Sequence, residues 1–306
     1  MTRRRALALL PALLLLFSVP SQSAYAQVWA KASLDKSPRH REYVPIQAGG
    51  RVVNTYVVYP EVAKKAPVIV LIHEIFGLSD WAKLMADELA GKGYIVLAPD
   101  LLSGTGPGMM NPESAAAGTD AATHADHMKE MAHTNGSAMG AGTTGTDSYT
   151  SMDEITKAVS GLPQAQVMSD LDAVASYGVR LPSADGKLFV AGFCWGGGKT
   201  FAFATHHAGI AAAFVFYGPP PPAADMAKIT APVYGFYAGN DARIDATLPD
   251  TVSAMKAAGK SFEPVTYDGA GHGFMRAGQA PDATPENRKA FDEGFNRLLA
   301  QLKSHS

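Results

Sequence analysis

The sequence contains a single cysteine, Cys194, among its 306 residues. One thiol cannot form a disulfide within the chain, so the small disulfide-stabilised domain classes are excluded. An excess of basic residues is also missing, because 26 Lys and Arg stand against 28 Asp and Glu. With no polybasic patch beyond Arg3–Arg5, we expect no nucleic-acid partner. Hydrophobic residues make up 47% of the chain, which is enough for a large buried core.

An apolar segment lies near the start of the chain, and it is shorter than a typical membrane-spanning helix. Residues 1–26 place Arg3–Arg5 before the apolar run Ala6–Val19, and Ala24-Tyr25-Ala26 follows as a small-residue cleavage site. This order is typical of a signal peptide rather than of an uncleaved anchor. Cleavage removes three arginines and no acid, which moves the formal charge from −2 to −5. We therefore expect an exported protein, periplasmic or secreted, without membrane contact after cleavage.

Short apolar runs alternate with amphipathic segments through the rest of the chain. The runs expected as buried strands are Val52–Tyr59, Pro67–His73, Tyr94–Pro99, Leu188–Phe193, Ala211–Tyr217, Val233–Ala238 and Pro264–Tyr267. The segments expected as helices are Asp80–Lys92 (capped by Asp80), Met168–Tyr177, Gly196–His207, Thr251–Ala258 and Glu286–Lys303. This alternation predicts one α/β domain over residues 27–306, with a doubly wound, mostly parallel sheet and helices on both faces. Val52–Tyr59 is expected to be antiparallel, and Gln27–His40 is expected to be an irregular lead-in.

One segment breaks this alternation. Residues 104–150 are rich in Gly, Ala, Ser and Thr and follow a strand end, where open α/β folds bind ligands, so they are interpreted as a low-complexity insert or lid. Within residues 121–133, four Met and His side chains fall on one helical face, namely His124, His127, Met128 and Met131. Such a face could bind a soft ion such as Cu(I), or it could cover an apolar substrate with its methionines. Packing is the more usual role, and the metal site is the alternative.

The pentapeptide Gly192-Phe193-Cys194-Trp195-Gly196 directly follows a predicted strand. Small residues on both sides of a nucleophile mark the strand-to-helix elbow of the α/β-hydrolase fold. Cys194 would lie at the N-terminus of the next helix, where free N–H groups favour a thiolate. The alternative is an apolar cysteine buried in a tight turn.

The fold requires an acid and then a histidine after the nucleophile along the chain. Asp241 follows the strand Val233–Ala238, and His272 lies in a glycine-rich loop after the last predicted strand. We expect His272 to take the thiol proton and Asp241 to orient the imidazole. Asp245 and Asp268 are the nearest alternatives for the acid.

The segment His73-Glu74-Ile75-Phe76-Gly77 follows another predicted strand. The fold supplies one oxyanion donor there, so we expect the backbone N–H groups of Ile75 and Trp195 to form the oxyanion hole. A carboxylate beside the thiol would raise the pKa of Cys194, so we expect Glu74 to act as a gate. Alternatively, Glu74 caps the helix that begins near Ser79.

Together these motifs resemble the dienelactone hydrolase family of α/β-hydrolases, over most of residues 45–300. The shared motifs are H-E-I-F-G at 73–77, A-P-D-L at 98–101, G-F-C-W-G-G at 192–197, the turn that ends at Asp241 and G-H-G-F-M-R at 271–276. The resemblance implies a triad of Cys194, Asp241 and His272, with Glu74 in contact with the cysteine. It also implies that Arg276 binds a substrate carboxylate.

The family cleaves an unsaturated lactone, or related esters, without a metal ion. The resemblance therefore implies a carboxylic ester or lactone hydrolase with a thioester intermediate, no cofactor and a small-molecule substrate as its partner. A broad-specificity exported esterase is the first alternative, and a metal-binding protein that uses residues 121–133 is the second. Tyr217, at a strand end, is expected to help bind substrate. The family's second arginine after A-P-D-L is missing here, and Arg243 is either its replacement or a surface residue.

Overall fold

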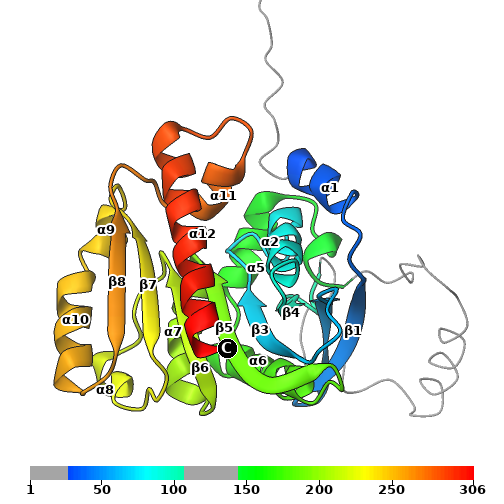
Figure 1. Ribbon diagram of the computed structural model, residues 1–306, viewed down its shortest axis with the longest axis horizontal. Coiled ribbons are helices and arrows are strands. Elements are labelled where there is room, and N and C mark those ends of the chain that lie inside the picture. Colours follow the sequence, from blue (N-terminus) through cyan, green and yellow to red (C-terminus); the bar gives the residue numbers. More distant parts are fainter. Residues whose placement is uncertain (1–26, 107–143) are drawn as a thin grey trace, which may run out of the picture.

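Eight strands form one sheet in the order β1-β2-β4-β3-β5-β6-β7-β8. A computed structural model describes residues 27–106 and 144–306 (Figure 1). The strands are β1 (Arg41–Ala48), β2 (Arg51–Val58), β3 (Ala66–Ile72), β4 (Ile95–Pro99), β5 (Ala184–Phe193), β6 (Ile210–Phe216), β7 (Val233–Ala238) and β8 (Phe262–Tyr267). β1 pairs antiparallel with β2 and β2 with β4, whereas β3 to β8 run parallel. The predicted mostly parallel α/β fold is confirmed.

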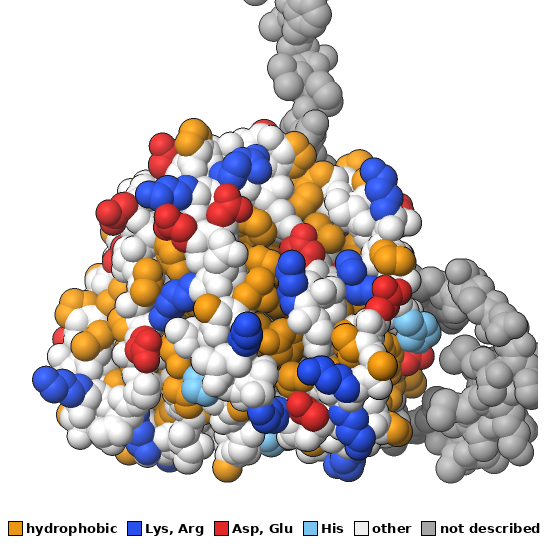
Figure 2. All heavy atoms as spheres, viewed as in Figure 1, with side chains coloured by type: hydrophobic (Ala, Val, Ile, Leu, Met, Phe, Trp, Pro, Cys, Tyr) orange, Lys and Arg blue, Asp and Glu red, His pale blue; other side chains and the backbone are white. Residues whose placement is uncertain are grey.

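Helices cover both faces of this sheet, and each face has its own apolar cluster. One face carries α1 (Val28–Leu34), α2 (Asp80–Ala90), α11 (Phe274–Gln279) and α12 (Pro285–His305). The other carries α6 (Gln164–Val179), α7 (Trp195–His206), α8 (Ala223–Met226), α9 (Ala242–Asp245) and α10 (Leu248–Ala257). Figure 2 shows acidic and basic side chains interspersed on the face that carries α12. In the described residues, no helix is both long and apolar enough to span a membrane.

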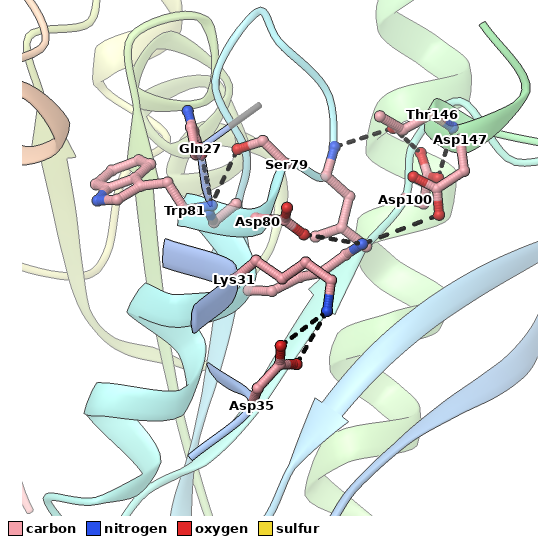
Figure 3. Close-up of polar contacts among 12 residues, drawn as sticks. Gln27, Lys31, Asp35, Ser79, Asp80, Trp81, Asp100, Thr146 and Asp147 are labelled. Atoms are coloured by element: carbon pink, nitrogen blue, oxygen red, sulfur yellow. Dashed lines mark hydrogen bonds and ion pairs between the residues drawn. The ribbon is translucent and has the colours of Figure 1, made fainter. Parts of the chain in front are cut away.

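The lead-in differs from its prediction. Residues 27–40 were expected to be irregular, but they contain α1, which buries Ala30 and Leu34 against α2. Gln27 fixes its start, because the Gln27 Oε1 accepts a hydrogen bond from the Trp81 backbone N–H at 2.7 Å (Figure 3). Two buried side chains give too short an apolar stripe to indicate a helix. The edge strand β1 was also missed, because half of its side chains are exposed and it contains Pro45.

The start of α2 also corrects the prediction. Ser79, not Asp80, is the N-cap, and its side-chain oxygen accepts a hydrogen bond from the Ala82 N–H at 3.4 Å (Figure 3). A serine hydroxyl at this position satisfies one of the free N–H groups of the first helical turn. The alternative interpretation of Glu74 as the cap of this helix is therefore excluded.

The insert leaves and re-enters the fold at one place, the carboxyl end of β4. Its two ends are joined by a hydrogen bond of 2.9 Å from the Gly145 N–H to the Thr105 carbonyl. The Thr146 N–H and hydroxyl donate to the Asp100 carboxylate at 2.7 and 2.8 Å (Figure 3). The same hydroxyl accepts from the Leu78 N–H at 2.9 Å. The returning chain is thus fixed beside the loop that follows β3. Residues 1–26, the predicted signal peptide, and residues 121–133 lie outside the described residues.

Two hydrogen bonds join α2 to Gln279, the last residue of α11. The Trp81 indole N–H donates to Gln279 Oε1 at 2.9 Å, and the Gln279 side-chain amide donates to Glu88 Oε1 at 2.5 Å. Burial raises the pKa of Glu88 to about 7, which outweighs the opposite effect of the Gln279 hydrogen bond. The folded protein therefore binds a proton at Glu88 more tightly than the unfolded chain does.

This difference predicts a pH-dependent gain in stability for Glu88→Gln. A raised pKa in the folded state stabilises the fold below about pH 4.5, and this contribution is lost as the pH rises through about 7. Glutamine stays neutral and can still accept from Gln279, so the variant should gain ~1–2 kcal/mol at pH 8 and little at pH 5, a range discounted for partial exposure. Urea unfolding at both pH values measures this. The exposed control Glu293→Gln should show no such difference, and an equal effect of Glu88→Gln at both values would contradict the interpretation.

Candidate active site

Cys194 lies at the turn between β5 and α7, with a φ of 56° that is unusual for a residue with a side chain. The turn depends on neighbouring glycines. A Cβ on Gly192 would lie 2.3 Å from the Gly196 carbonyl oxygen, and a Cβ on Gly196 would lie 2.3 Å from the His73 carbonyl oxygen. Only glycine permits this approach of α7 to β3 and β5. The sulfur is held above the start of α7, as the sequence predicted.

His272 lies between Cys194 and Asp241. Its Nε2 is 3.1 Å from the Cys194 Sγ, and its Nδ1 is 2.5 Å from Asp241 Oδ2. A carboxylate only accepts, so Nδ1 carries the proton and Nε2 is left to take the proton of the thiol. Asp241, 7% exposed, is therefore the acid in contact with the imidazole, and neither Asp245 nor Asp268 makes that contact. The three side chains come from three different strand ends at one edge of the sheet.

The resting state of Cys194 is the thiol. Burial, followed by the negative charge of Glu74, raises the pKa of Cys194 to about 11. The backbone N–H groups of Trp195 and Ile75 face the sulfur and act in the opposite direction, as does the positive charge of Arg243. The helix N-terminus alone favours a thiolate, but burial and Glu74 together outweigh it. The two N–H groups expected to form an oxyanion hole thus converge on the sulfur.

Glu74, which the resemblance places in contact with Cys194, also has a charged partner. Its carboxylate is 2% exposed and accepts from the Arg276 Nε at 2.7 Å. The Arg276 guanidinium also lies over the Phe76 ring, 4.9 Å from its centroid. Glu74 therefore acts on Cys194 through its charge, and Arg276, expected to bind a substrate carboxylate, is paired with a carboxylate of the protein.

Tyr217 packs behind His272 and is fully buried. Its ring lies edge-on to the imidazole, with 5.1 Å between the ring centroids, and also contacts Phe274 at 5.2 Å. Its role in substrate binding stays a prediction, because a substrate reaches this side chain only if neighbouring groups move. Arg243 is exposed on α9, two residues after Asp241 in the chain, and its charge lowers the pKa of the Cys194 thiol.

His73 and Asp100 were given no role from the sequence, yet both are buried polar residues beside this site. His73 follows β3 and Asp100 follows β4, at the same edge of the sheet as Cys194. Both residues belong to motifs that carry the resemblance, His73 to H-E-I-F-G and Asp100 to A-P-D-L. Each follows a fully apolar strand. A polar residue at such a strand end was the signal that could have identified them.

A metal site is not found in the part of the chain that the structure describes. No cluster of three or more His, Cys, Asp or Glu side chains lies close enough there to hold an ion. The Met and His residues of 121–133 lie outside it.

The chain is similar to known proteins in family, in sequence and in structure. A family model described as the dienelactone hydrolase family matches residues 53–306. A protein of Methylorubrum extorquens, assigned as a carboxymethylenebutenolidase, is 31% identical over 269 residues, which cover 83% of this chain and 77% of that protein. A protein of Salmonella typhi with the same assignment is 29% identical and covers 83% of each chain. A crystal structure from Klebsiella pneumoniae, assigned as a dienelactone hydrolase, has a TM-score of 0.65 and 26% identity, and covers 86% of this chain and 97% of that one.

The charge of Glu74 on the thiol leads to a prediction for Glu74→Gln. Without that charge the pKa of Cys194 should fall, and the thiolate fraction at neutral pH should rise about tenfold for each pKa unit. Alkylation by iodoacetamide should therefore be faster, and mass spectrometry can follow it without ambiguity because the chain has one thiol. Glu88→Gln, which removes a distant and partly buried carboxylate, is the matched control. An unchanged or slower alkylation of Glu74→Gln would refute the assigned role of the charge.

Proposed function

This chain belongs to the dienelactone hydrolase family, and from that membership we propose that it hydrolyses a carboxylic ester or lactone through a thioester on Cys194. One observation carries the proposal. The Cys194 Sγ, the His272 ring and the Asp241 carboxylate form one hydrogen-bonded line, with contacts of 3.1 and 2.5 Å. A thiol with a pKa of about 11 needs such a base, because little thiolate exists at neutral pH.

In the first half of the reaction, His272 Nε2 takes the proton from Cys194 Sγ as the sulfur attacks the carbonyl carbon. Asp241 accepts from Nδ1–H and stabilises the imidazolium that forms. The carbonyl oxygen becomes an oxyanion and binds to the N–H groups of Ile75 and Trp195. The carbon–oxygen bond then breaks, the leaving oxygen takes the proton from His272, and a thioester remains on Cys194.

In the second half, water attacks the thioester. His272 Nε2 takes a proton from the water, and the same two N–H groups bind the second oxyanion. Collapse of this intermediate releases the carboxylic acid, and the sulfur recovers its proton from His272. The products are the acid and the alcohol or enol of the ester, which stay joined in one molecule when the substrate is a lactone.

The nucleophile favours particular substrates. In the tetrahedral intermediate the thiolate and the leaving oxygen compete to depart. Burial and Glu74 raise the pKa of Cys194 to about 11, which lies above the value of about 10 for a phenol and well below that of an alkanol. A simple alkoxide therefore loses this competition, and an enolate or aryloxide does not. We propose an enol lactone or an activated ester as substrate, with an anionic group that competes with Glu74 for Arg276.

The test combines variants with detection of the intermediate. Cys194→Ala should lower kcat on 4-nitrophenyl acetate and on a carboxylated enol lactone by at least ~10³-fold, and Asp241→Asn by ~10³–10⁴-fold. Intact-mass measurement during turnover should show an acyl adduct on the native enzyme that hydroxylamine removes. Asp268→Asn, an exposed acid near His272 in the chain, is the control and should keep its activity. If Cys194→Ala retains most of the activity, the thioester mechanism is wrong.

We also propose that the enzyme is exported, from the charge and hydropathy pattern of residues 1–26. Expression of the full chain in a bacterium with two membranes should place esterase activity in the periplasmic or extracellular fraction. N-terminal sequencing of that protein should begin at Gln27. Activity that stays in the cytoplasm with an intact N-terminus would contradict export.

A further inference from the structure

His73 is a histidine with no exposed surface, at the carboxyl end of β3. Its Nδ1 lies 2.7 Å from the carbonyl oxygen of Glu74, the next residue. A carbonyl oxygen accepts and never donates, so this nitrogen carries the proton. The Gly77 N–H donates to the same oxygen at 3.2 Å. Two donors therefore hold one carbonyl group in place.

That carbonyl belongs to the same peptide unit as the Ile75 N–H. No cis peptide bond occurs in residues 27–106 and 144–306, and in a planar trans unit the C=O and N–H point in opposite directions. Holding the Glu74 oxygen on the His73 side therefore fixes the Ile75 N–H on the other side, where it faces the Cys194 sulfur. A rotation of this peptide would turn the N–H away and aim a carbonyl oxygen at the site.

The imidazole of His73 is itself held. It stacks on the Trp195 indole, with 5.5 Å between the ring centroids and 10° between the ring planes. The Trp195 backbone N–H is the second group that faces the sulfur. One ring thus contacts both residues whose N–H groups would bind the oxyanion, Ile75 through the Glu74 carbonyl and Trp195 through its indole.

Burial keeps this ring neutral, because it lowers the pKa of His73 against the opposing charge of Asp100. The His73 Nε2 is buried, and it has no hydrogen-bond partner in the described part of the chain. Asp100 is in turn held by the Thr146 N–H and hydroxyl and by the Leu102 N–H. A neutral ring with its proton on Nδ1 is the form that donates to Glu74.

We propose that His73 is a positioning residue of the oxyanion hole, whose Nδ1–H hydrogen bond to the Glu74 carbonyl aims the Ile75 N–H at the reacting carbonyl oxygen. The inference rests on the proposed function, because an acyl transfer is the reaction that needs this donor. His73 does not touch the substrate. Its contribution is to stabilise one orientation of a peptide plane before the substrate arrives, which lowers the reorganisation that the oxyanion would otherwise require.

Two variants separate the donor from the ring. His73→Phe keeps a buried ring against Trp195 and loses the N–H, whereas His73→Asn places its side-chain nitrogen where Nδ1 stood and loses the stack. Loss of one oxyanion donor costs ~10²–10³-fold in turnover, and the Gly77 N–H still restrains the peptide. We therefore expect kcat of His73→Phe to fall by at least about tenfold with KM nearly unchanged, and His73→Asn to stay within about threefold of the native enzyme.

The alkylation rate of Cys194 against pH gives a second measurement that needs no substrate. The Ile75 N–H lowers the pKa of this thiol, so a misaimed N–H should move the alkylation profile of His73→Phe to higher pH and leave that of His73→Asn in place. This profile tests the aim of the peptide even if the chain cleaves no ester. Failure of the proposed function would appear in the substrate assays alone.

Nitrogen NMR of the native protein labelled at histidine gives a test without any variant. The ring signals of His73, identified by their loss in His73→Asn, should show the proton on Nδ1. A proton on Nε2 would overturn the proposal, as would native turnover and a native alkylation profile in His73→Phe. Equal losses in both variants would also overturn it, because ring packing and not the hydrogen bond would then be responsible. If His73→Phe does not fold, the proton position and the activity of His73→Asn decide the question.

Discussion

The close approach of α7 to the ends of three strands is the constraint on which the site depends. A Cβ on Gly197 would lie 2.4 Å from the Phe216 carbonyl oxygen, and one on Gly218 would lie 2.2 Å from the Gly198 nitrogen. Together with Gly192 and Gly196, these residues let backbone meet backbone where side chains would separate helix from sheet. The positive φ of Cys194 follows from that contact, and so does the meeting of two N–H groups at one sulfur. The geometry of the site is therefore a consequence of the close packing of α7 against the sheet.

Electrostatics then sets the resting state. Burial and the charge of Glu74 raise the pKa of Cys194, so the sulfur rests as a thiol. Arg276 pairs with Glu74 and compensates its negative charge. A protonated thiol reacts slowly with oxidants and alkylating agents. In the proposed mechanism, Cys194 becomes reactive when His272 removes its proton in the presence of a carbonyl group, and the thiol is otherwise protected. Control of reactivity lies in the neighbours of the sulfur and not in the sulfur itself.

Much of this was accessible from the sequence, for a physical reason. Buried parallel strands are continuous apolar runs, and their order along the chain places Cys194, Asp241 and His272 at one edge of the sheet. What depends on distant partners was not accessible. The contact between Glu74 and Arg276 joins residues 202 positions apart in the sequence, and the motifs gave no sign of it. α1 was missed because it buries only two side chains, and β1 was missed because it is the outermost strand of the sheet. The orientation of the peptide between Glu74 and Ile75 cannot be predicted from residue types alone.

The joined ends of the insert have a consequence for the evolution of this chain. Thr105 and Gly145 are hydrogen-bonded to each other, and Thr146 is anchored to Asp100, so contacts among the described residues hold the two ends of the insert together. The entropy of closing a loop grows only with the logarithm of its length, so residues can be added or deleted there at small thermodynamic cost. The fold can therefore accept segments of different length and sequence between Thr105 and Gly145. Related sequences could differ there, and with it in substrate range, while the sheet and the proposed catalytic residues stay the same.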